Sequence, residues 1–348
     1  MSAPLTEKHV EIAGRRIGPG YPPYVIAELS ANHNGSLAAA LSLIEAAAEA
    51  GADAVKIQTY RADTITIESD QPEFSIKGGL WDGQSLYELY EQAHTPWEWH
   101  AELFAKASDV GITMFSSPFD FTAVDLLEEL GAPAFKIASF EAVDLPLIRR
   151  VCGAGKPVII STGMSDEDEI ESAVDTARQA GCEELIVLHC VSGYPAPASD
   201  YNLRTLVDIG ARHDVVVGLS DHTLGNATAI AAIALGASVI EKHFTLDRDG
   251  GGPDDSFSLE PRELKALCRD CRIAWEALGE VDYTRKQSEK GNAQFRRSLY
   301  VVADVKAGDI VTPENVRSIR PGFGLAPRYY DDILGRRFVS DVSRATPV

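Results

Sequence analysis

The stretch VVVGLSDHTLGNATAIAAIALGASVIEKHFT, residues 215–245, decides the fold of this chain. Apolar runs at 215–219 and 237–240 each end in a polar cluster, and 227–235 between them has helical apolar spacing. Gly236-Ala237 is typical of a helix C-cap that leads directly into a strand. The stretch therefore predicts a strand, helix, strand unit in which His222 and His243 follow neighbouring buried strands, where a metal ion can be held.

The same alternation continues along the chain, so that the unit is one of a series. Further strands are expected at 25–27, 54–57, 113–115, 134–137, 158–160 and 185–188, and further helices at 37–50, 97–108, 123–130, 167–180 and 261–278. Eight units in about 250 residues predict an α/β fold of the closed (β/α)8 TIM-barrel type. An open doubly wound sheet is the alternative, although no GxGxxG follows the first strand.

The pattern changes at both ends of the repeats. Residues 9–24 resemble a short hairpin that plugs the bottom of the barrel, and the long connection 60–96 belongs to the active face of such a fold. Polar residues 281–296 indicate a linker, and 297–348 indicate a small domain of short strands and turns. We therefore expect a barrel over 1–280 and a C-terminal domain that packs against its own barrel or a partner's.

Composition excludes several classes of protein. A net charge of −20 argues against a nucleic-acid surface, because phosphate binding needs clustered Lys and Arg. No apolar run reaches the roughly 18 residues of a membrane span, and the first ten residues lack the apolar core of a signal peptide, so a soluble cytoplasmic protein is expected. Five scattered cysteines argue against a disulfide framework, and Cys268 and Cys271 are expected to pack on one helix face rather than hold zinc.

Every expected strand ends in polar residues. Lys56 and Lys136 follow apolar strands where an unpaired charge is costly, so each is expected to meet an anion. Hydroxyl groups at the neighbouring strand ends offer donors for a phosphate or carboxylate: Ser139, Ser161, Thr162, Ser192 and Ser220. His222 and His243 fit an open catalytic site for Mn²⁺ or a similar divalent ion, with two ordinary rim histidines as the alternative. His189 is expected to be structural, and Glu28 either a general base or a helix cap.

Together these motifs resemble the sialic acid synthase family, in order and over nearly the whole chain. The motifs are Ala27-Glu28, Asn32-His33-Asn34-Gly35, Val55-Lys56-Ile57-Gln58, Ser116-Ser117-Pro118-Phe119, Phe135-Lys136-Ile137-Ala138-Ser139, Ser161-Thr162-Gly163-Met164, His189-Cys190, Tyr194-Pro195, Gly218 to Thr223, Glu241 to Thr245, Gly252-Pro253-Asp254 and Ser258-Leu259-Glu260-Pro261. In the tail, Phe295-Arg296-Arg297-Ser298 and Arg320-Pro321-Gly322 resemble the family's antifreeze-like (SAF) domain. The resemblance implies a TIM barrel with a SAF domain, working as a domain-swapped homodimer.

The resemblance also implies an activity and residue roles. Family members are transferases that condense phosphoenolpyruvate with an open-chain N-acylated amino sugar and release phosphate. Lys56 and Ser117 would bind the carboxylate of phosphoenolpyruvate, and its phosphate would be bound by Lys136, Ser139, Ser161, Ser192 and Ser220. Glu28 would act at the reacting centre, a metal on His222 and His243 would polarise the aldehyde, and the sugar would be contacted by Gln58, Glu141, Tyr194, Asp254 and a partner's Arg320. Ser192 stands where N-acetylneuraminate synthases usually have Asn.

Two segments resemble the pseudaminic acid synthase branch of the family. They are 78–99, with Gly78-Gly79-Leu80-Trp81-Asp82-Gly83, and 250–258, with Gly250-Gly251-Gly252-Pro253-Asp254-Asp255. The sugar of that branch, 2,4-diacetamido-2,4,6-trideoxy-L-altrose, has a methyl group that apolar surface near Trp81 or Phe257 would favour. N-acetylneuraminate and legionaminic acid synthases remain alternatives, as do a metal aldolase that does not use phosphoenolpyruvate, a non-catalytic sugar-binding protein and a structural role for the tail.

Overall fold

The computed structural model describes residues 8–78 and 81–348, and it divides the chain into two compact units. One unit ends at Gly279 and the other is Glu280–Val348. In the described part of the chain, no helix has the length and apolar character needed to cross a bilayer. Residues 1–7 and the pair Gly79-Leu80 of the long connection lie outside the described residues.

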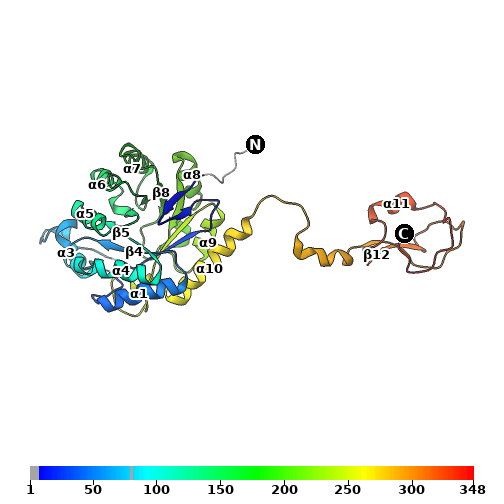
Figure 1. The fold of residues 1–348 in the computed structure, drawn as a ribbon, viewed down its shortest axis with the longest axis horizontal. Coiled ribbons are helices and arrows are strands. Elements are labelled where there is room, and N and C mark those ends of the chain that lie inside the picture. Colours follow the sequence, from blue (N-terminus) through cyan, green and yellow to red (C-terminus); the bar gives the residue numbers. More distant parts are fainter. Residues whose placement is uncertain (1–7, 79–80) are drawn as a thin grey trace. The chain divides into compact units, whose positions relative to one another are not determined.

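The first unit is a closed barrel of eight parallel strands in the order β10-β3-β4-β5-β6-β7-β8-β9, which confirms the TIM-barrel prediction (Figure 1). The strands are β3 (Tyr24–Glu28), β4 (Ala54–Thr59), β5 (Thr113–Pro118), β6 (Phe135–Ile137), β7 (Val158–Ser161), β8 (Leu185–Cys190), β9 (Val216–Ser220) and β10 (Val239–His243). The last strand closes onto the first, with His243 opposite Glu28. Closure therefore brings residues from the two ends of the repeat series side by side.

Helices surround the barrel in chain order (Figure 1). They are α1 (Leu37–Ala50), α4 (His100–Val110), α5 (Phe121–Glu129), α6 (Leu145–Cys152), α7 (Glu167–Gln179), α8 (Arg204–His213), α9 (Ala227–Ala234) and α10 (Pro261–Leu278). The expected glycine caps are confirmed at Gly51 and Gly111, which end α1 and α4 in the left-handed conformation. Each cap turns the chain directly into the next strand.

Apolar side chains fill the barrel interior and the layer between strands and helices. The interior includes Tyr24, Ile26, Phe115, Ile159 and Ile186, all with an exposed fraction of 0%. The hairpin β1 (Val10–Ile12) and β2 (Arg15–Ile17) adds Val10, Ile12 and Ile17 to this same cluster, as the sequence predicts for a plug. The amino end of the barrel is thus closed by apolar packing, and polar groups collect at the carboxyl end.

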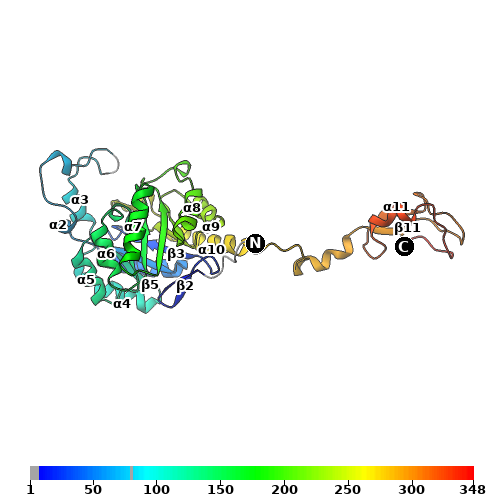
Figure 2. The same ribbon diagram turned by 90° about the horizontal axis from the view of Figure 1, so that it is seen from above.

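The connection 60–96 leaves the barrel after β4 and contains α2 (Ala62–Ile65) and α3 (Leu86–Ala93). Figure 2 shows this segment standing out from the ring of helices. Short 3₁₀ turns occur at Pro72–Phe74, Trp97–Trp99, Ser139–Glu141, Ala198–Asp200, Asp255–Phe257, Gln287–Phe295 and Pro327–Tyr329.

The second unit contains an antiparallel pair, β11 (Ser298–Val301) and β12 (Val316–Ile319), and the short α11 (Tyr330–Ile333). Its small core consists of Leu299, Val301, Val305, Val311 and Val316. Such a core is modest, as expected for a domain of this size.

Candidate active site

Strand alternation decides which polar residues of β9 and β10 enter the barrel. Glu241 contacts lysines of other strands inside the barrel, whereas Lys242 pairs outside with Asp221 at 2.9 Å and donates to Thr223 O at 2.7 Å. Successive side chains of a strand point to opposite faces, so His243 returns to the inner side. His222 and His243 then meet, with 5.4 Å between their ring centroids.

Four buried charges form the floor of the site. Lys56 Nζ lies 2.7 Å from Glu28 Oε2 and 3.7 Å from Glu241 Oε1, and Lys136 Nζ lies 3.4 Å from the same Glu241 oxygen. All four residues are at most 5% exposed. Because an unpaired buried charge is costly, two ammonium and two carboxylate groups compensate one another here. The anion that both lysines contact in the protein alone is therefore Glu241.

The pKa values in this cluster depend on burial and on the opposite charges near each group. Burial raises the pKa of Glu28, and nearby Lys56 offsets this only in part. Burial alone would raise the pKa of Glu241, but the positive charges of Lys136 and Lys56 lower it overall. Burial alone would lower the pKa of Lys56, but the carboxylates of Glu241 and Glu28 raise it overall. Lys136 has one carboxylate neighbour at contact distance, and burial lowers its pKa. Lys136 is thus the less compensated lysine.

The histidine pair carries one free imidazole nitrogen in each ring. His222 Nδ1 lies 2.9 Å from Val191 O, which leaves Nε2 for a ligand. His243 Nδ1 is buried and has no hydrogen-bond partner in the described part of the chain. Burial, followed by the neighbouring His222, holds the pKa of His243 well below its ordinary value, so this ring is neutral. Burial alone would lower the pKa of His222, but its contact with Cys190 raises it overall, so this ring must lose any proton before it binds a metal. Neutral imidazoles are the form that binds metals.

His222 and His243 fit a divalent ion whose remaining ligands are water or substrate. Within residues 8–78 and 81–348, no group of three or more His, Cys, Asp or Glu is arranged to hold a metal. Two histidines alone leave several coordination positions to water or substrate, as an open catalytic site requires. Tyr194 packs on His222 with 4.4 Å between ring centroids and fixes the position of that ring.

Hydroxyl groups converge beside Lys136. Ser139 Oγ accepts a hydrogen bond from Gly163 N at 3.1 Å. A Cβ atom added at Gly163 would lie 2.2 Å from Ser192 Oγ and 2.8 Å from Ser139 Oγ, which shows how closely both approach this turn. Ser161 Oγ and Ser192 Oγ are buried without a hydrogen-bond partner among the described residues. Unsatisfied buried hydroxyls are costly unless a ligand engages them.

The remaining predicted hydroxyls also lie at the carboxyl ends of their strands. Ser117, in β5, lies 3.2 Å from Lys56 Nζ through its Oγ, and Ser220 ends β9 with an exposed fraction of 3%. The structure therefore brings the predicted lysines and serines to one end of the barrel.

A second group of polar residues lies on the Glu28 side. Gln58 Nε2 donates to Glu28 Oε1 at 2.9 Å and lies 3.1 Å from Ser30 Oγ. Ser30 in turn donates to Asp254. Gln58 and Asp254, far apart in the sequence, are thereby linked through Ser30, which sequence reasoning did not single out.

Glu141 follows β6 in a short 3₁₀ turn. Its Oε2 is buried without a partner in the described residues, and burial raises the pKa of this carboxyl to about 7. A carboxyl with such a pKa is protonated below neutrality and can then donate a hydrogen bond.

Aromatic side chains pack beside the histidine pair. Phe257 lies 5.1 Å from His243 and 5.3 Å from Tyr194, and Trp81 lies 6.1 Å from Tyr194, all between ring centroids. Trp81 Nε1 also donates to Pro253 O at 3.3 Å. The long connection and the loop after β10 therefore meet at the site.

Three residues of the site were not assigned roles from the sequence. Glu241 appears in the sequence only as the first residue of a motif, Ser30 is a single small residue in a loop, and Cys190, whose Sγ lies 3.9 Å from His222 Nδ1, follows a histidine that is predicted to be structural. The period of two along β10 was the available signal for Glu241, because it places Glu241 on the same side as His243. His189 has the predicted structural role, since its Nε2 lies 2.5 Å from Tyr201 O.

Two other predicted features belong to other elements of the chain. Arg320 directly follows β12 in the second unit and is not part of the barrel. Cys268 and Cys271 lie on α10 and pack into the apolar layer around the barrel, as expected for a helix face.

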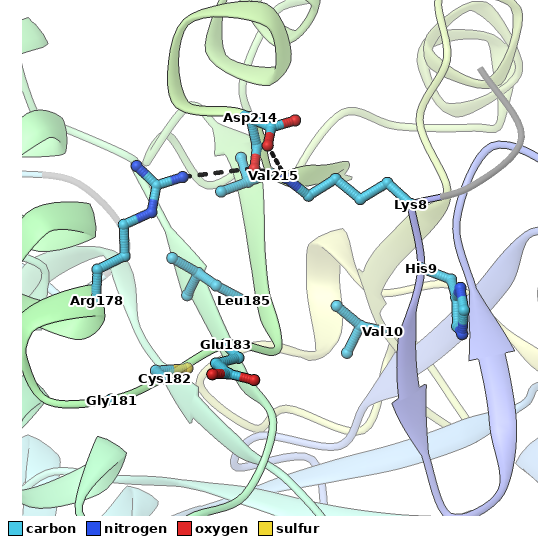
Figure 3. Close-up of a pocket in the computed structure, with 10 residues that line it drawn as sticks. All are labelled: Lys8, His9, Val10, Arg178, Gly181, Cys182, Glu183, Leu185, Asp214 and Val215. Atoms are coloured by element: carbon cyan, nitrogen blue, oxygen red, sulfur yellow. Dashed lines mark hydrogen bonds and ion pairs between the residues drawn. The ribbon is translucent and has the colours of Figure 1, made fainter. Parts of the chain in front are cut away.

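A cavity of about 380 Å³ lies at the opposite end of the barrel, between the hairpin and the amino ends of β8 and β9 (Figure 3). Two cationic side chains of its lining have partners within the protein: Lys8 Nζ lies 2.6 Å from Asp214 Oδ2, and Arg178 donates to main-chain oxygens of His213 and Asp214. Because TIM-barrel active sites lie at the carboxyl end, this cavity is separate from the site described above.

Comparisons with known proteins agree with this geometry. Residues 43–283 match the NeuB family, and residues 296–348 match the SAF domain. The chain is 46% identical to a pseudaminic acid synthase of Campylobacter jejuni, covering 92% of this chain and 93% of the relative. It is 42% identical to a pseudaminic acid synthase of Helicobacter pylori, covering 94% and 96%.

A solved structure shares the fold. The N-acetylneuraminic acid (sialic acid) synthetase of Leptospira borgpetersenii, in complex with citrate, has a TM-score of 0.73 and 30% identity, covering 83% of this chain and 96% of that chain.

Proposed function

The chain belongs to the NeuB family and ends in a SAF domain, and from this premise we infer that it is a pseudaminic acid synthase. The reaction condenses phosphoenolpyruvate with 2,4-diacetamido-2,4,6-trideoxy-L-altrose and water, and yields pseudaminic acid and phosphate. One observation carries the proposal: two buried lysines and two adjacent histidines lie at the strand ends of the barrel, in a chain that is 46% identical to a pseudaminic acid synthase over 92% of its residues.

The two lysines and the serines around them suit phosphoenolpyruvate as a ligand. We propose that Lys56 and Ser117 bind its carboxylate and that Lys136, Ser139, Ser161, Ser192 and Ser220 bind its phosphate. Support comes from the unpartnered Ser161 and Ser192 hydroxyls and from Lys136, whose buried charge has one close carboxylate neighbour. A phosphate beside Lys136 supplies acceptors to all three groups.

We propose that the sugar binds beside Glu28 and the histidine pair. We propose that Gln58, Glu141, Tyr194 and Asp254 contact its polar groups, and that the methyl group lies against Phe257 or Trp81. The link from Gln58 through Ser30 to Asp254 supports a shared surface for one ligand. Because an apolar pocket discriminates a methyl from a hydroxymethyl group only modestly, the polar contacts supply much of the selectivity.

The chemistry then follows from this placement. Carbon 3 of phosphoenolpyruvate attacks the sugar aldehyde, water adds to the resulting cation at carbon 2, and the tetrahedral intermediate expels phosphate through C–O cleavage. His222 and His243 would hold a divalent ion, which we propose to be Mn²⁺ with Mg²⁺ or Co²⁺ as alternatives, and this ion would supply Lewis-acid polarisation of the aldehyde. Glu28, held by Lys56 and Gln58, acts at the reacting centre as base or orienting group.

We also propose a homodimer in which the SAF domain of a second copy covers the site and brings Arg320 to the sugar. Apolar side chains on the loops of the active face support a covering partner: Phe140 is 59% exposed and Met164 77% exposed, in the segments that follow β6 and β7. Exposed apolar groups gathered on one face are typical of interaction surfaces. In the cytoplasm, where we place the enzyme, the five free thiols stay reduced.

Phosphate release tests the proposal directly. With Mn²⁺ present, inorganic phosphate should appear only when phosphoenolpyruvate and the altrose derivative are both supplied. N-acetylmannosamine and the legionaminic acid precursor serve as matched competing sugars. Comparable rates with all three sugars would contradict the pseudaminic branch, and pyruvate consumption without phosphate release would indicate an aldolase instead.

A further inference from the structure

The loop between β10 and α10, residues 246–258, is built around one buried carboxylate. Asp255 is 1% exposed and accepts hydrogen bonds from three donors. They are Thr245 Oγ1 at 2.5 Å, Gly252 N at 2.8 Å and Asn34 Nδ2 at 2.9 Å. The carboxylate thereby joins the end of β10, its own loop and the connection after β3.

The three consecutive glycines of this loop explain how the chain wraps so closely around Asp255. A Cβ atom at Gly252 would lie 1.8 Å from Asn34 Oδ1, and one at Gly250 would lie 2.7 Å from Asp255 Oδ2. Gly251 has a φ of +82°, which side chains other than glycine rarely adopt. The glycine run is therefore required by the approach of the backbone to Asp255 and Asn34.

Every second residue from 30 to 34, in the connection after β3, donates a hydrogen bond to this loop. Ser30 donates to Asp254, Asn32 Nδ2 donates to Ser258 Oγ at 2.9 Å, and Asn34 donates to Asp255. Ser258 Oγ closes the loop on itself by donating to Asp254 O at 2.6 Å. Two loops that meet only through barrel closure are held together along their length.

This loop carries three groups of the sugar side of the site. Asp254 leads through Ser30 to Gln58, Pro253 O accepts the Trp81 indole N–H, and Phe257 packs on His243 and Tyr194. Asp255 itself contacts none of them through its carboxylate. A shift of the loop backbone at Asp255 would nonetheless move its neighbours Asp254 and Phe257 together.

We infer that Asp255 is a positioning residue that sets sugar affinity, because its carboxylate fixes the loop that carries Asp254, Pro253 and Phe257. The inference rests on the proposed function, since it takes the ligand of these groups to be the acetamido sugar. The residues proposed to bind phosphoenolpyruvate lie on or just after β4 to β9, outside the loop that Asp255 holds. We therefore expect phosphoenolpyruvate binding to be independent of Asp255.

The Asp255→Asn variant tests this inference. An amide keeps the size of the side chain but removes its negative charge, so the bonds from Gly252 N and Asn34 Nδ2 lose their charge assistance, and the Thr245 hydroxyl must change from donor to acceptor. In phosphate-release assays with Mn²⁺, the KM for the altrose sugar should rise at least about tenfold while the KM for phosphoenolpyruvate stays within about twofold. Hydrogen exchange of residues 246–258 should become faster without added substrate.

Two matched variants complete the experiment. Gly252→Ala keeps the carboxylate but displaces Asn34, and it should change the sugar KM in the same direction. Asp249→Asn removes an exposed carboxylate of the same loop and should match the wild type. An unchanged sugar KM in Asp255→Asn, or equal rises of both KM values, overturns the inference. A wild-type enzyme that releases no phosphate from the two substrates overturns the proposed function instead, and the exchange measurement still reports on the loop.

Discussion

At the scale of single residues, the site is governed by how each buried charge is compensated. Glu241 serves both lysines, at 3.7 Å from Lys56 and 3.4 Å from Lys136. A ligand that brings its own negative charge to the lysines competes with that role. If phosphoenolpyruvate binds Lys136 as proposed, the protein with and without this substrate would differ in which anion balances Lys136.

Glu241→Gln makes this balance measurable. The variant leaves two buried lysines with one close carboxylate, Glu28, so its free energy of unfolding should fall by about 3 kcal/mol or more. Added phosphoenolpyruvate restores negative charge, so the ligand should raise the melting temperature more in the variant than in the wild type. Differential scanning fluorimetry with and without phosphoenolpyruvate measures both effects. Equal ligand-induced shifts in the two proteins would contradict the shared-anion explanation.

Glu141 predicts a pH dependence of stability. Burial raises its pKa from 4.5 to about 7, so the folded protein keeps a proton that the unfolded chain releases. The stabilisation is present below pH 4.5 and is lost as the pH rises to 7, by at most about 3 kcal/mol. Glu141→Gln should therefore gain stability over the wild type across this window, measured by urea unfolding from pH 5 to 8. The exposed Glu129→Gln serves as control, and a pH-independent difference would refute the assignment.

At the scale of elements, the sequence predicted the strands and their polar ends well but not their contacts. Each apolar run ending in polarity located a strand, since burial in a parallel barrel leaves a strong local signal. The pairing of Lys242 with Asp221 outside the barrel depends on the register between β9 and β10, and the sequence of one strand does not reveal that register. The Ser30 to Asp254 contact joins residues 224 apart, and only barrel closure creates it.

The Asp221 and Lys242 pair braces the two strand ends that carry His222 and His243. Lys242→Met leaves a buried carboxylate with only its Thr223 contacts, so the free energy of unfolding should fall by about 3–5 kcal/mol. The double variant Asp221→Asn with Lys242→Met removes both charges and should recover most of that loss. Urea unfolding measures stability, and Mn²⁺ electron paramagnetic resonance measures metal affinity, which should weaken in the single variant. Equal stability of single and double variants would show that the pair contributes no coupling.

At the scale of the whole molecule, the question is whether one site is built from two copies. The structure gives two compact units, and the proposed sugar contact Arg320 belongs to the second of them. The sequence could indicate a C-terminal domain because the alternation of strands and helices stops before it, and such a change is visible locally in the sequence. In the proposed dimer, the pairing of that tail with a particular barrel would depend on contacts between copies, and no local pattern in the sequence records such contacts.

Complementation between two inactive variants tests the swapped arrangement. Lys136→Met disables the barrel of one copy, and Arg320→Ala disables the tail of the other. In a swapped heterodimer, the intact barrel of the Arg320→Ala copy receives the intact tail of the Lys136→Met copy, and one of the two sites works. Random pairing after co-expression should then restore about a quarter of the wild-type rate of phosphate release. A single chain carrying both substitutions, co-expressed with itself, should stay inactive. If each site used its own tail, the mixture would be no more active than either variant alone.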